Sequence, residues 1–417
     1  MSLLTSGSGA RKSLSRDFVL RVLTQIGMVA LAIVQSAIVA RWLGPEGKGL
    51  LVLLLWVPVL VVDSLGGFRD AVTWSLGKEV FERDRIISAM VGLWAMVSVS
   101  GAAIMGVAWL IQDLPLGMGA LVAAICYVPA FLAMRLVNGL ALGMRWMSAV
   151  NRTQLIFKVT CVIAVALALV GLGAGPDGVV WAMIFGAAAG FAYALVWARD
   201  IGRFGISLDP EVLRTLVAKG AVFSIALLLY KLNFRADMLL VEYFRDTTDV
   251  GLYSQGVGII ELVLRVPTAL GAVIFSHSAA AVDAEKFRLR MRRIVTRAVP
   301  LLAIASAGLC AIAPWLIPGL YGEDFTASVP VVWALAPGMV SIGVFQLIVS
   351  DFNGRGRPEV GLYAATASLV VNLGLNFWWI PLYGTIGAGV ASTVSYSVAA
   401  IILFIAQGKS AQVSDAA

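Results

Sequence analysis

The sequence predicts an all-α polytopic membrane protein whose twelve transmembrane helices form two lobes of six helices each. Three observations predict this fold class. First, 60% of the 417 residues are hydrophobic and only 13% are charged, whereas about 25% of the residues in a soluble protein are charged. Second, apolar stretches of about 18 residues or more recur along the chain, as expected for membrane-spanning helices. Third, the end of the first predicted helix resembles the end of the seventh.

The predicted helices follow one another with short polar turns between them. The first six are expected at 17–43, 48–76, 86–112, 117–144, 153–174 and 177–198, and the second six at 215–244, 250–278, 295–321, 326–352, 359–381 and 385–407. The first apolar run follows a basic N-terminus, but it continues to Leu43 and many spans follow, so an uncleaved first helix is expected. Turn segments such as WLGPEGKG, QDLPLG and GAGPDG mark the boundaries, because glycine and proline interrupt helices.

Prolines and small residues inside the apolar runs predict how the helices bend and pack. Pro58, Pro129, Pro267, Pro300, Pro314, Pro330 and Pro337 lie inside or near predicted spans. Proline removes a helical hydrogen bond, so kinks are expected there. The stretches GLALG (139–143) and GAAAG (186–190) carry glycines four residues apart, which lets neighbouring helices approach closely.

The distribution of lysine and arginine predicts the orientation. One set of turns carries most of the basic residues, which lie in 11–16, 78–85, 145–152, 199–219, 286–297, 355–357 and at Lys409, whereas the opposite turns carry only Arg41, Lys48 and Arg245. By the positive-inside rule the basic face is cytoplasmic, and both termini lie on it. The net charge of +7 therefore describes the cytoplasmic face, and no nucleic-acid partner is expected.

These assignments divide the chain into five predicted parts. They are a cytoplasmic N-terminal tail (1–16), an N-lobe (17–198), a cytoplasmic linker (199–214), a C-lobe (215–407) and a cytoplasmic C-terminal tail (408–417). The basic stretch KFRLRMRR (286–293) is expected in the longest inner loop. It serves either as an orientation signal or as a contact to anionic head groups.

The few cysteine and histidine residues do not indicate a metal or cofactor site. Cys126, Cys161 and Cys310 all lie inside apolar runs and are expected to act as small buried hydrophobic residues. His277 is the only histidine, and the cysteines show no metal-ligand spacing. No cofactor, no metal and no nucleotide site is expected, so an ion gradient or consumption of the product must supply any energy.

The two predicted lobes resemble each other in sequence. VARWLGPEGKGLL (39–51) and LVEYFRDTTDVGLY (240–253) each end an apolar helix with an aromatic residue, a polar turn and a Gly-Leu pair. A tandem repeat of six helices places a pseudo-two-fold axis along the membrane normal, as in transporters with a site between two repeats. Aligning Gly49 with Gly251 places Asp63 opposite Arg265, and aligning the turns places Arg41 opposite Glu242.

Several stretches carry a family resemblance that covers nearly the whole chain. ARWLGPEGKGLLVLL, LGGFRDAVTWSLGK, DMLLVEYFRDTTDVGLYS and LYGEDFTASVPVVWALAP resemble Wzx-type polysaccharide flippases. Those proteins share the MOP superfamily with MATE drug exporters and lipid II flippases. The resemblance implies a MATE-like fold that moves a lipid-linked oligosaccharide across the bacterial cytoplasmic membrane. Lipid II flippases usually have two helices more than the twelve predicted here.

Charged residues inside the predicted spans are the candidate site residues. A charge at the bilayer centre costs at least about 2.5–3.5 kcal/mol, so such residues usually face a bundle interior or a wet cavity. Four cations are predicted to bind an anionic substrate: Arg69, Lys231, Arg235 and Arg265. In helix 215–244, Lys231, Arg235, Met238 and Glu242 fall within about 60° of one another, whereas Asn233 and Asp237 form a second stripe.

Two further roles, ion coupling and an outer gate, are predicted for charged residues. Asp237 and Asp63 are the candidates for coupling to an ion gradient, because a carboxylate in a low-dielectric lumen can load and release a proton. Arg41 and Glu242 are predicted to form an outer gate between equivalent helix ends. Local alternatives stay open, namely a bond from Arg265 to Glu261 and a structural hydrogen bond between Asp237 and Asn233.

Three classes of function follow from these residues. The first is a flippase for an isoprenoid diphosphate-linked oligosaccharide, with that substrate and membrane lipids as its partners and with a polymerase or glycosyltransferase acting next to it. The second is a MATE-type exporter of small organic cations, but the buried cations outnumber the midplane acids Asp63, Asp70, Asp237 and Glu261. The third, a membrane enzyme, is disfavoured because the outer turns are too short to carry a catalytic site.

Overall fold

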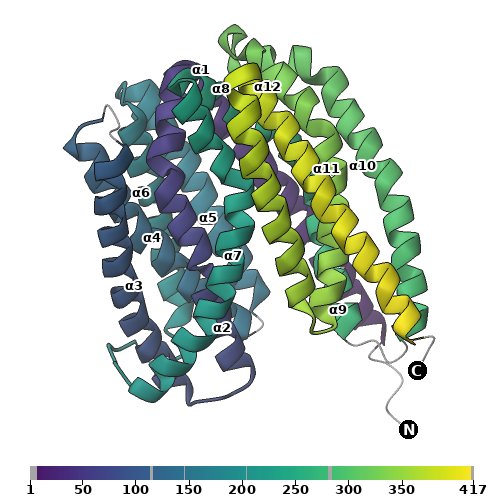
Figure 1. The fold of residues 1–417 in the computed structure, drawn as a ribbon. Coiled ribbons are helices and arrows are strands. Elements are labelled where there is room, and N and C mark those ends of the chain that lie inside the picture. The colour runs from purple at the N-terminus through teal and green to yellow at the C-terminus, as the bar shows by residue number, and fades with distance from the viewer. Residues whose placement is uncertain (1–6, 113–115, 145, 203, 280–283, 415–417) are drawn as a thin grey trace. The chain divides into compact units, whose positions relative to one another are not determined.

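A computed structural model describes residues 7–112, 116–144, 146–202, 204–279 and 284–414, and all regular structure in these ranges is helical (Figure 1). The helices are α1 (Gly7–Ser64), α2 (Gly66–Gly77), α3 (Arg83–Gln112), α4 (Met118–Gly143), α5 (Met147–Ala166), α6 (Pro176–Ala198), α7 (Pro210–Phe244), α8 (Thr247–Ile260), α9 (Arg265–Ala279), α10 (Ala284–Tyr321), α11 (Val329–Gly354) and α12 (Pro358–Ser414). Residues 1–6 and 415–417 of the two predicted tails lie outside the described residues, whereas residues 7–16 and 408–414 are helical and belong to α1 and α12.

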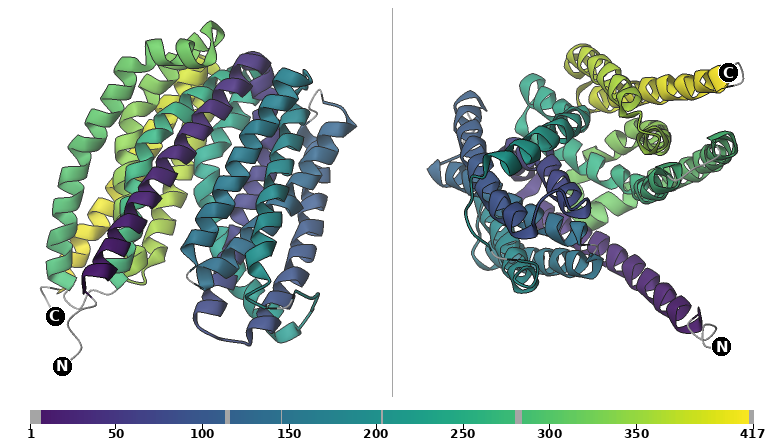
Figure 2. Two further views of the ribbon diagram at one scale, coloured as in Figure 1. Left: turned by 180° about the vertical axis from the view of Figure 1, so that it is seen from behind. Right: turned by 90° about the horizontal axis from the view of Figure 1, so that it is seen from below.

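The chain divides into two compact units. Unit 1 contains residues 1–42 and 57–227, and unit 2 contains residues 43–56 and 228–417. Segment 43–56, in the middle of α1, thus belongs with the second half of the chain. The predicted lobe limits at 17–198 and 215–407 stay a prediction. Within each unit the helices run side by side over most of their length (Figure 2).

α1 and α12 each contain two helices that meet at a glycine. Gly44 has φ 66° and Gly384 has φ 59°, which is the left-handed region where glycine is favoured. Nine helices in the described residues are long and apolar enough to cross a membrane, and two of them hold 52 and 50 residues. A helix of that length measures about 75 Å, more than twice the hydrocarbon core of a bilayer. With α7, which has 35 residues, the helices are compatible with twelve spans.

Several predicted helix limits differ in the structure. The turn expected at 44–47 corresponds to the kink at Gly44 between the two helices of α1, and the second of these helices ends at Ser64 and not at residue 76. The span expected at 250–278 is broken by a 3-10 turn, Glu261–Leu264, between α8 and α9. KFRLRMRR was expected in a loop but lies within α10, where Met291 is buried while Arg290 and Arg292 are exposed.

Other helices begin earlier or end differently than predicted. α5 begins at Met147 and passes into a π-helical turn, Leu167–Gly171. α7 begins at Pro210, because the Asp209 side chain accepts hydrogen bonds from the backbone amides of Glu211 (3.1 Å) and Val212 (3.4 Å). An N-capping aspartate followed by proline is a helix-start signal, so the sequence contained the information for this boundary.

Unit 1 is held together by a buried cluster from α2, α3, α4, α6 and the first part of α7. Its fully buried members include Ile86, Leu140 and Val212. The predicted small-residue contacts are confirmed in this unit. A Cβ atom on Gly143 would lie 2.7 Å from Leu76 of α2, and one on Gly186 would lie 2.7 Å from Cys161 of α5.

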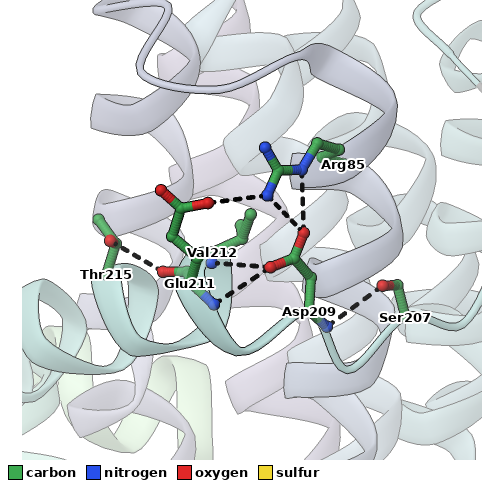
Figure 3. A network of polar contacts seen from close by, with 6 residues as sticks. All are labelled: Arg85, Ser207, Asp209, Glu211, Val212 and Thr215. Carbon is green, nitrogen blue, oxygen red and sulfur yellow. Dashed lines mark hydrogen bonds and ion pairs between the residues drawn. The ribbon is translucent and has the colours of Figure 1, made fainter.

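An ion-pair network ties the start of α7 to α3 within unit 1 (Figure 3). The Arg85 guanidinium bonds to Asp209 at 2.7 Å and to Glu211 at 3.0 Å. The backbone amide of Ser207 also donates to the Ser88 carbonyl at 3.1 Å. Ser207 and Asp209, in the segment that precedes α7, are therefore both bonded to α3.

Unit 2 is built around α11, which packs against α8, α9, α10 and α12. The helices of this unit also approach one another closely at glycines. A Cβ atom on Gly338 of α11 would lie 2.7 Å from Thr393 of α12, and one on Gly256 of α8 would lie 2.9 Å from Val331. This packing fixes the walls of the cavity described next.

Candidate substrate-binding cavity

Unit 2 contains a cavity of about 240 Å³ with an excess of positive charge. Its lining residues come from α7, the 3-10 turn, α9 and α11, and are Lys231, Phe234, Arg235, Glu261, Leu264, Arg265, Thr268 and Gln346. Three of them are cations and one is a carboxylate. Lys231 and Arg235 are half-buried, whereas Arg265 is exposed. Such a cavity suits an anionic ligand, because half-buried cations gain from a partner of opposite charge.

Helix α7 supplies two of the three cations. Lys231 and Arg235 are four residues apart and therefore lie on one side of the helix, where both line the cavity. The Arg235 guanidinium contacts the Met238 sulfur at 4.0 Å, so it extends along α7 toward the helix end at Phe244. Asn233 and Asp237, on the other stripe, are buried and do not line the cavity.

The third cation stands where the eighth span is interrupted. Pro267 lies in the first turn of α9, where a missing amide proton is tolerated, and the preceding residues form the 3-10 turn Glu261–Leu264. This break turns Glu261 and Arg265 toward the same cavity. Pro267 was recognised in the sequence as a kink, but the sequence did not indicate that the break would line a cavity.

No ion pair is recorded between Arg265 and Glu261 in the described residues, although both line the cavity. Thr268 Oγ1 donates to Gln346 Oε1 at 3.1 Å, which joins α9 to α11 at the same wall. Gln346, Thr268 and Phe234 were not predicted as site residues. They are neutral, and composition or charge patterning alone does not single them out.

Asp237 is buried in a polar network inside unit 2, with 2% of its surface exposed. Its Oδ2 atom accepts hydrogen bonds from Tyr253 Oη (2.5 Å) and Ser392 Oγ (3.3 Å). Asn372 Nδ2 donates to Ser392 Oγ at 3.1 Å. α7, α8 and α12 therefore meet at one carboxylate. Its side-chain partners are Tyr253 and Ser392 and not Asn233, and its Oδ1 atom accepts from the backbone amide of Met238 at 2.9 Å.

The same network extends along α12. Asn376 Nδ2 donates to Asn372 Oδ1 at 2.9 Å, and Asn233 Nδ2 donates to Ser368 Oγ at 3.0 Å. The Oδ1 atom of Asn376 is buried and has no hydrogen-bond partner in the described residues. An unpartnered acceptor next to a buried carboxylate network leaves oxygen ligands available to a small cation.

Two of the residues predicted to bind substrate or couple to ions lie in unit 1. The Arg69 guanidinium bonds to the neighbouring Asp70 at 2.6 Å. Asp63 is bonded to Arg135 of α4, which also donates to the Val62 carbonyl at 3.2 Å. The sequence placed Asp63 opposite Arg265, but within unit 1 its carboxylate has a local partner. The roles predicted for Arg69 and Asp63 stay predictions.

The two predicted gate residues belong to different units. Arg41, in unit 1, has an exposed side chain. Glu242, in unit 2, accepts a hydrogen bond from Thr247 Oγ1 at 3.0 Å through one oxygen. Its other oxygen, Oε2, is buried and has no hydrogen-bond partner in the described residues.

The helical fold and the cationic cavity define a class of membrane transport proteins. An inward-facing multidrug resistance MATE transporter of the MOP superfamily has a TM-score of 0.80 to this chain at 16% identity, over 93% of this chain and 95% of its own. The lipid II flippase MurJ in an inward closed conformation gives a TM-score of 0.75 at 12% identity, over 93% and 87% of the two chains. These likenesses confirm the MATE-like fold predicted from the sequence.

The chain belongs to the polysaccharide biosynthesis protein family, which matches residues 14–275. The lipid II flippase MurJ family matches residues 147–417. The resemblance found in the sequence motifs is thus confirmed at the level of the family.

Two relatives extend this comparison. A probable flippase, AglR, from Haloferax volcanii is 27% identical over 187 residues, which is 42% of this chain and 38% of that protein's length. A putative O-antigen transporter from Shigella flexneri is 21% identical over 400 residues, which is 89% of this chain and 92% of the relative.

Proposed function

We propose that this protein is a flippase that moves an isoprenoid diphosphate-linked oligosaccharide across the bacterial cytoplasmic membrane by alternating access. The observation that carries the proposal is the cavity in unit 2, where three cations face one carboxylate. A diphosphate carries the opposite charge and several acceptor oxygens. Membership of the polysaccharide biosynthesis protein family, and relatives named a probable flippase and a putative O-antigen transporter, support this substrate class.

Each cation has a distinct part in the proposed binding. Arg235 and Arg265 each donate paired hydrogen bonds to phosphate oxygens, because a guanidinium is planar, always charged and can donate two parallel hydrogen bonds. Lys231 adds a compact charge from the same side of α7. Arg69 is proposed to bind the diphosphate as well, in competition with its ion pair to Asp70. The isoprenoid tail stays in the bilayer while the head group crosses.

We further propose that Asp237 couples transport to an ion gradient. The buried network around it, with the unpartnered Oδ1 atom of Asn376, supports this role because a proton or a small cation would complete it. Asp63 is proposed as a second coupling residue, since it could exchange its bond with Arg135 for a proton or for another cation.

The remaining assignments follow from the same proposal. Arg41 and Glu242 act as an outer gate that closes in one state and parts in the other. The protein is a multi-pass protein of the cytoplasmic membrane with both termini inside the cell, and it works as a transporter and not as an enzyme. A polymerase or glycosyltransferase machinery supplies or consumes the lipid-linked sugar.

A MATE-type exporter of organic cations shares the fold, so the charge of the cavity is the deciding feature. An organic cation would have to approach Lys231, Arg235 and Arg265 against their repulsion, with Glu261 as the one carboxylate of the lining. The charge balance therefore favours an anionic ligand.

The proposal is tested by replacing Arg235. The purified full-length protein in lipid nanodiscs should bind farnesyl diphosphate, and Arg235→Gln should lower the affinity by about tenfold to a hundredfold, since a hydrogen bond to a charged group contributes about 1.5–3 kcal/mol. In cells, Arg235→Gln should abolish export of the polysaccharide while the protein remains in the membrane. Arg235→Lys should retain part of both activities.

Arg245→Gln is the matched control, because Arg245 is also a cation of unit 2 but packs against Gly384 and does not line the cavity. It should bind and export normally. Normal export by Arg235→Gln, or transport of an organic cation that farnesyl diphosphate does not inhibit, would overturn the proposal.

A further inference from the structure

Segment 43–56 carries a cation, Lys48, that charge patterning assigned to an outer turn. The structure places this residue four residues after the kink at Gly44, in the second helix of α1, with a half-buried side chain, and groups the segment with unit 2. Lys48 therefore belongs to the same compact unit as the cationic cavity. Its position relative to α7 and α8 rests on three close contacts.

Two of these contacts are reciprocal approaches between glycines and backbone. A Cβ atom on Gly49 would lie 1.8 Å from the Thr247 carbonyl oxygen, and one on Gly251 would lie 1.9 Å from the Pro45 carbonyl oxygen. Only glycine permits such an approach. The backbone next to Lys48 is thus pressed against the start of α8, and these glycines are the two that the sequence repeat aligns.

The third contact fixes the other end of the segment. Trp56 Nε1 donates to the Arg235 carbonyl oxygen at 2.7 Å, so Trp56 lies at the level of the cavity. Lys48 precedes Trp56 by eight residues, which is about 12 Å along a helix and about 80° around it. Lys48 therefore lies further toward the outer end of unit 2, roughly on the side that faces α7.

The guanidinium of Arg235 points in the same direction, because it reaches along α7 to Met238. Lys48 and Arg235 therefore lie close enough for their positive charges to repel each other. No carboxylate is bonded to Lys48 or to Arg235 in the described residues. Two cations held together without an acid make a place where an anion is stabilised.

We propose that Lys48 is an additional anion-binding residue that receives the diphosphate after Arg235 and holds it on the outer side of the cavity. This inference rests on the proposed flippase function. The cations of unit 2 then form a track in three levels: Lys231 and Arg265 at the inner level, Arg235 in the middle and Lys48 at the outer level. The diphosphate moves outward between neighbouring charges and is never left without a partner.

A lysine whose only role is to reach water would be placed differently. A long ammonium side chain near a helix end can extend into water and away from other charges. Lys48 is instead half-buried and within electrostatic reach of Arg235, while the backbone on both sides of it is pinned to unit 2. The charge is thus held close to Arg235 by packing.

The test separates binding from transfer. The full-length protein is reconstituted in liposomes, and transport of dansyl-labelled farnesyl diphosphate is measured beside its equilibrium binding. Lys48→Gln should lower the maximal transport rate by about tenfold, the effect of removing one charge-assisted contact. Its affinity for the probe should stay within about twofold, because the inner cations remain. Arg235→Gln should lower both quantities, and Lys48→Arg should restore the rate.

Each outcome has a defined meaning. Loss of rate in Lys48→Gln with intact binding, rescue by Lys48→Arg and normal transport by Arg245→Gln support the track. Wild-type transport rates in Lys48→Gln overturn it while leaving the flippase proposal intact. An equal loss in Lys48→Arg, accompanied by a lower melting temperature in both variants, shows a structural role and also overturns it. A wild-type protein that does not bind the probe overturns the flippase proposal and, with it, this inference.

Discussion

Trp56 and Arg235 are joined by a hydrogen bond of 2.7 Å from the indole to a main-chain carbonyl, although they are 179 residues apart in sequence. The bond holds the middle of α1 against α7 at the depth of the cationic cavity. It thereby fixes both the backbone that carries Arg235 and the segment that carries Lys48.

Trp56→Phe should weaken this connection while preserving an aromatic side chain. Loss of one hydrogen bond should lower the free energy of unfolding by about 0.5–1.5 kcal/mol, and the transport rate should fall because Arg235 is held less firmly. Thermal unfolding in detergent and export in cells measure the two effects. Trp42→Phe is the control, since Trp42 is 52% exposed. Equal behaviour of the two variants would contradict the assigned role of Trp56.

Gly251→Ala should disrupt the contact between α8 and segment 43–56. The new methyl group would lie 1.9 Å from the Pro45 carbonyl oxygen, which is backbone and cannot move aside by a rotamer change. Overpacking of this kind costs about 1–3 kcal/mol or more, so the melting temperature and the amount of protein in the membrane should fall. Gly258→Ala in the same helix meets no atom within 4 Å and should be neutral or stabilising. Similar losses in both variants would show that the close approach is not the cause.

Asp237→Asn should uncouple transport from the ion gradient while keeping the shape of the buried network. An amide cannot release a proton and binds a cation more weakly than a carboxylate does. In proteoliposomes, wild-type flux should change several-fold with an imposed pH or sodium gradient, and flux through Asp237→Asn should not. Flux through the wild-type protein that ignores both gradients would rule out coupling at this residue.

The Arg85–Asp209 pair gives a pH dependence of stability (Figure 3). The hydrogen bond from Arg85 holds the pKa of the Asp209 carboxyl below its ordinary value of 3.8. A carboxyl whose pKa is lowered by folding stabilises the folded state above that ordinary value, and this contribution disappears as the pH falls through the folded-state pKa.

Wild type should therefore melt at a higher temperature than Asp209→Asn at neutral pH, and the difference should vanish on acidification below pH 3.8. Asp200→Asn, on the same connecting segment and exposed, serves as the control and should show no such difference. A gap between wild type and Asp209→Asn that persists at low pH would contradict the assignment.

Charge reversal tests the proposed outer gate. A partly exposed pair contributes about 0.2–1 kcal/mol, enough to shift two states of similar energy by a few-fold. Arg41→Glu and Glu242→Arg should each lower the transport rate, and the double variant should recover part of it. Cysteines at both positions should cross-link only in the state that is closed on the outside. A double variant no better than the worse single variant would argue against the gate.

The sequence by itself determined the elements that depend on local chemistry. Long apolar runs require helices, because backbone groups in lipid must be hydrogen-bonded within the segment. Lysine and arginine counts predict the orientation, and helical periodicity places Lys231 and Arg235 on one side of α7 and Asp237 on another. The start of α7 was also present in the sequence, as Asp209 followed by Pro210.

Only the tertiary structure decided which distant groups meet. Tyr253 and Ser392 reach Asp237 from 16 and 155 residues away, and the Gly49 and Gly251 contacts bring segment 43–56 into unit 2. Charge patterning placed Lys48 in an outer turn, but it cannot show that the segment after Gly44 packs against α8. Periodicity specifies the face of a helix, but the partner of that face depends on packing between helices far apart in sequence. The cationic character of the site was therefore predictable from α7, whereas its proposed extension to Lys48 was not.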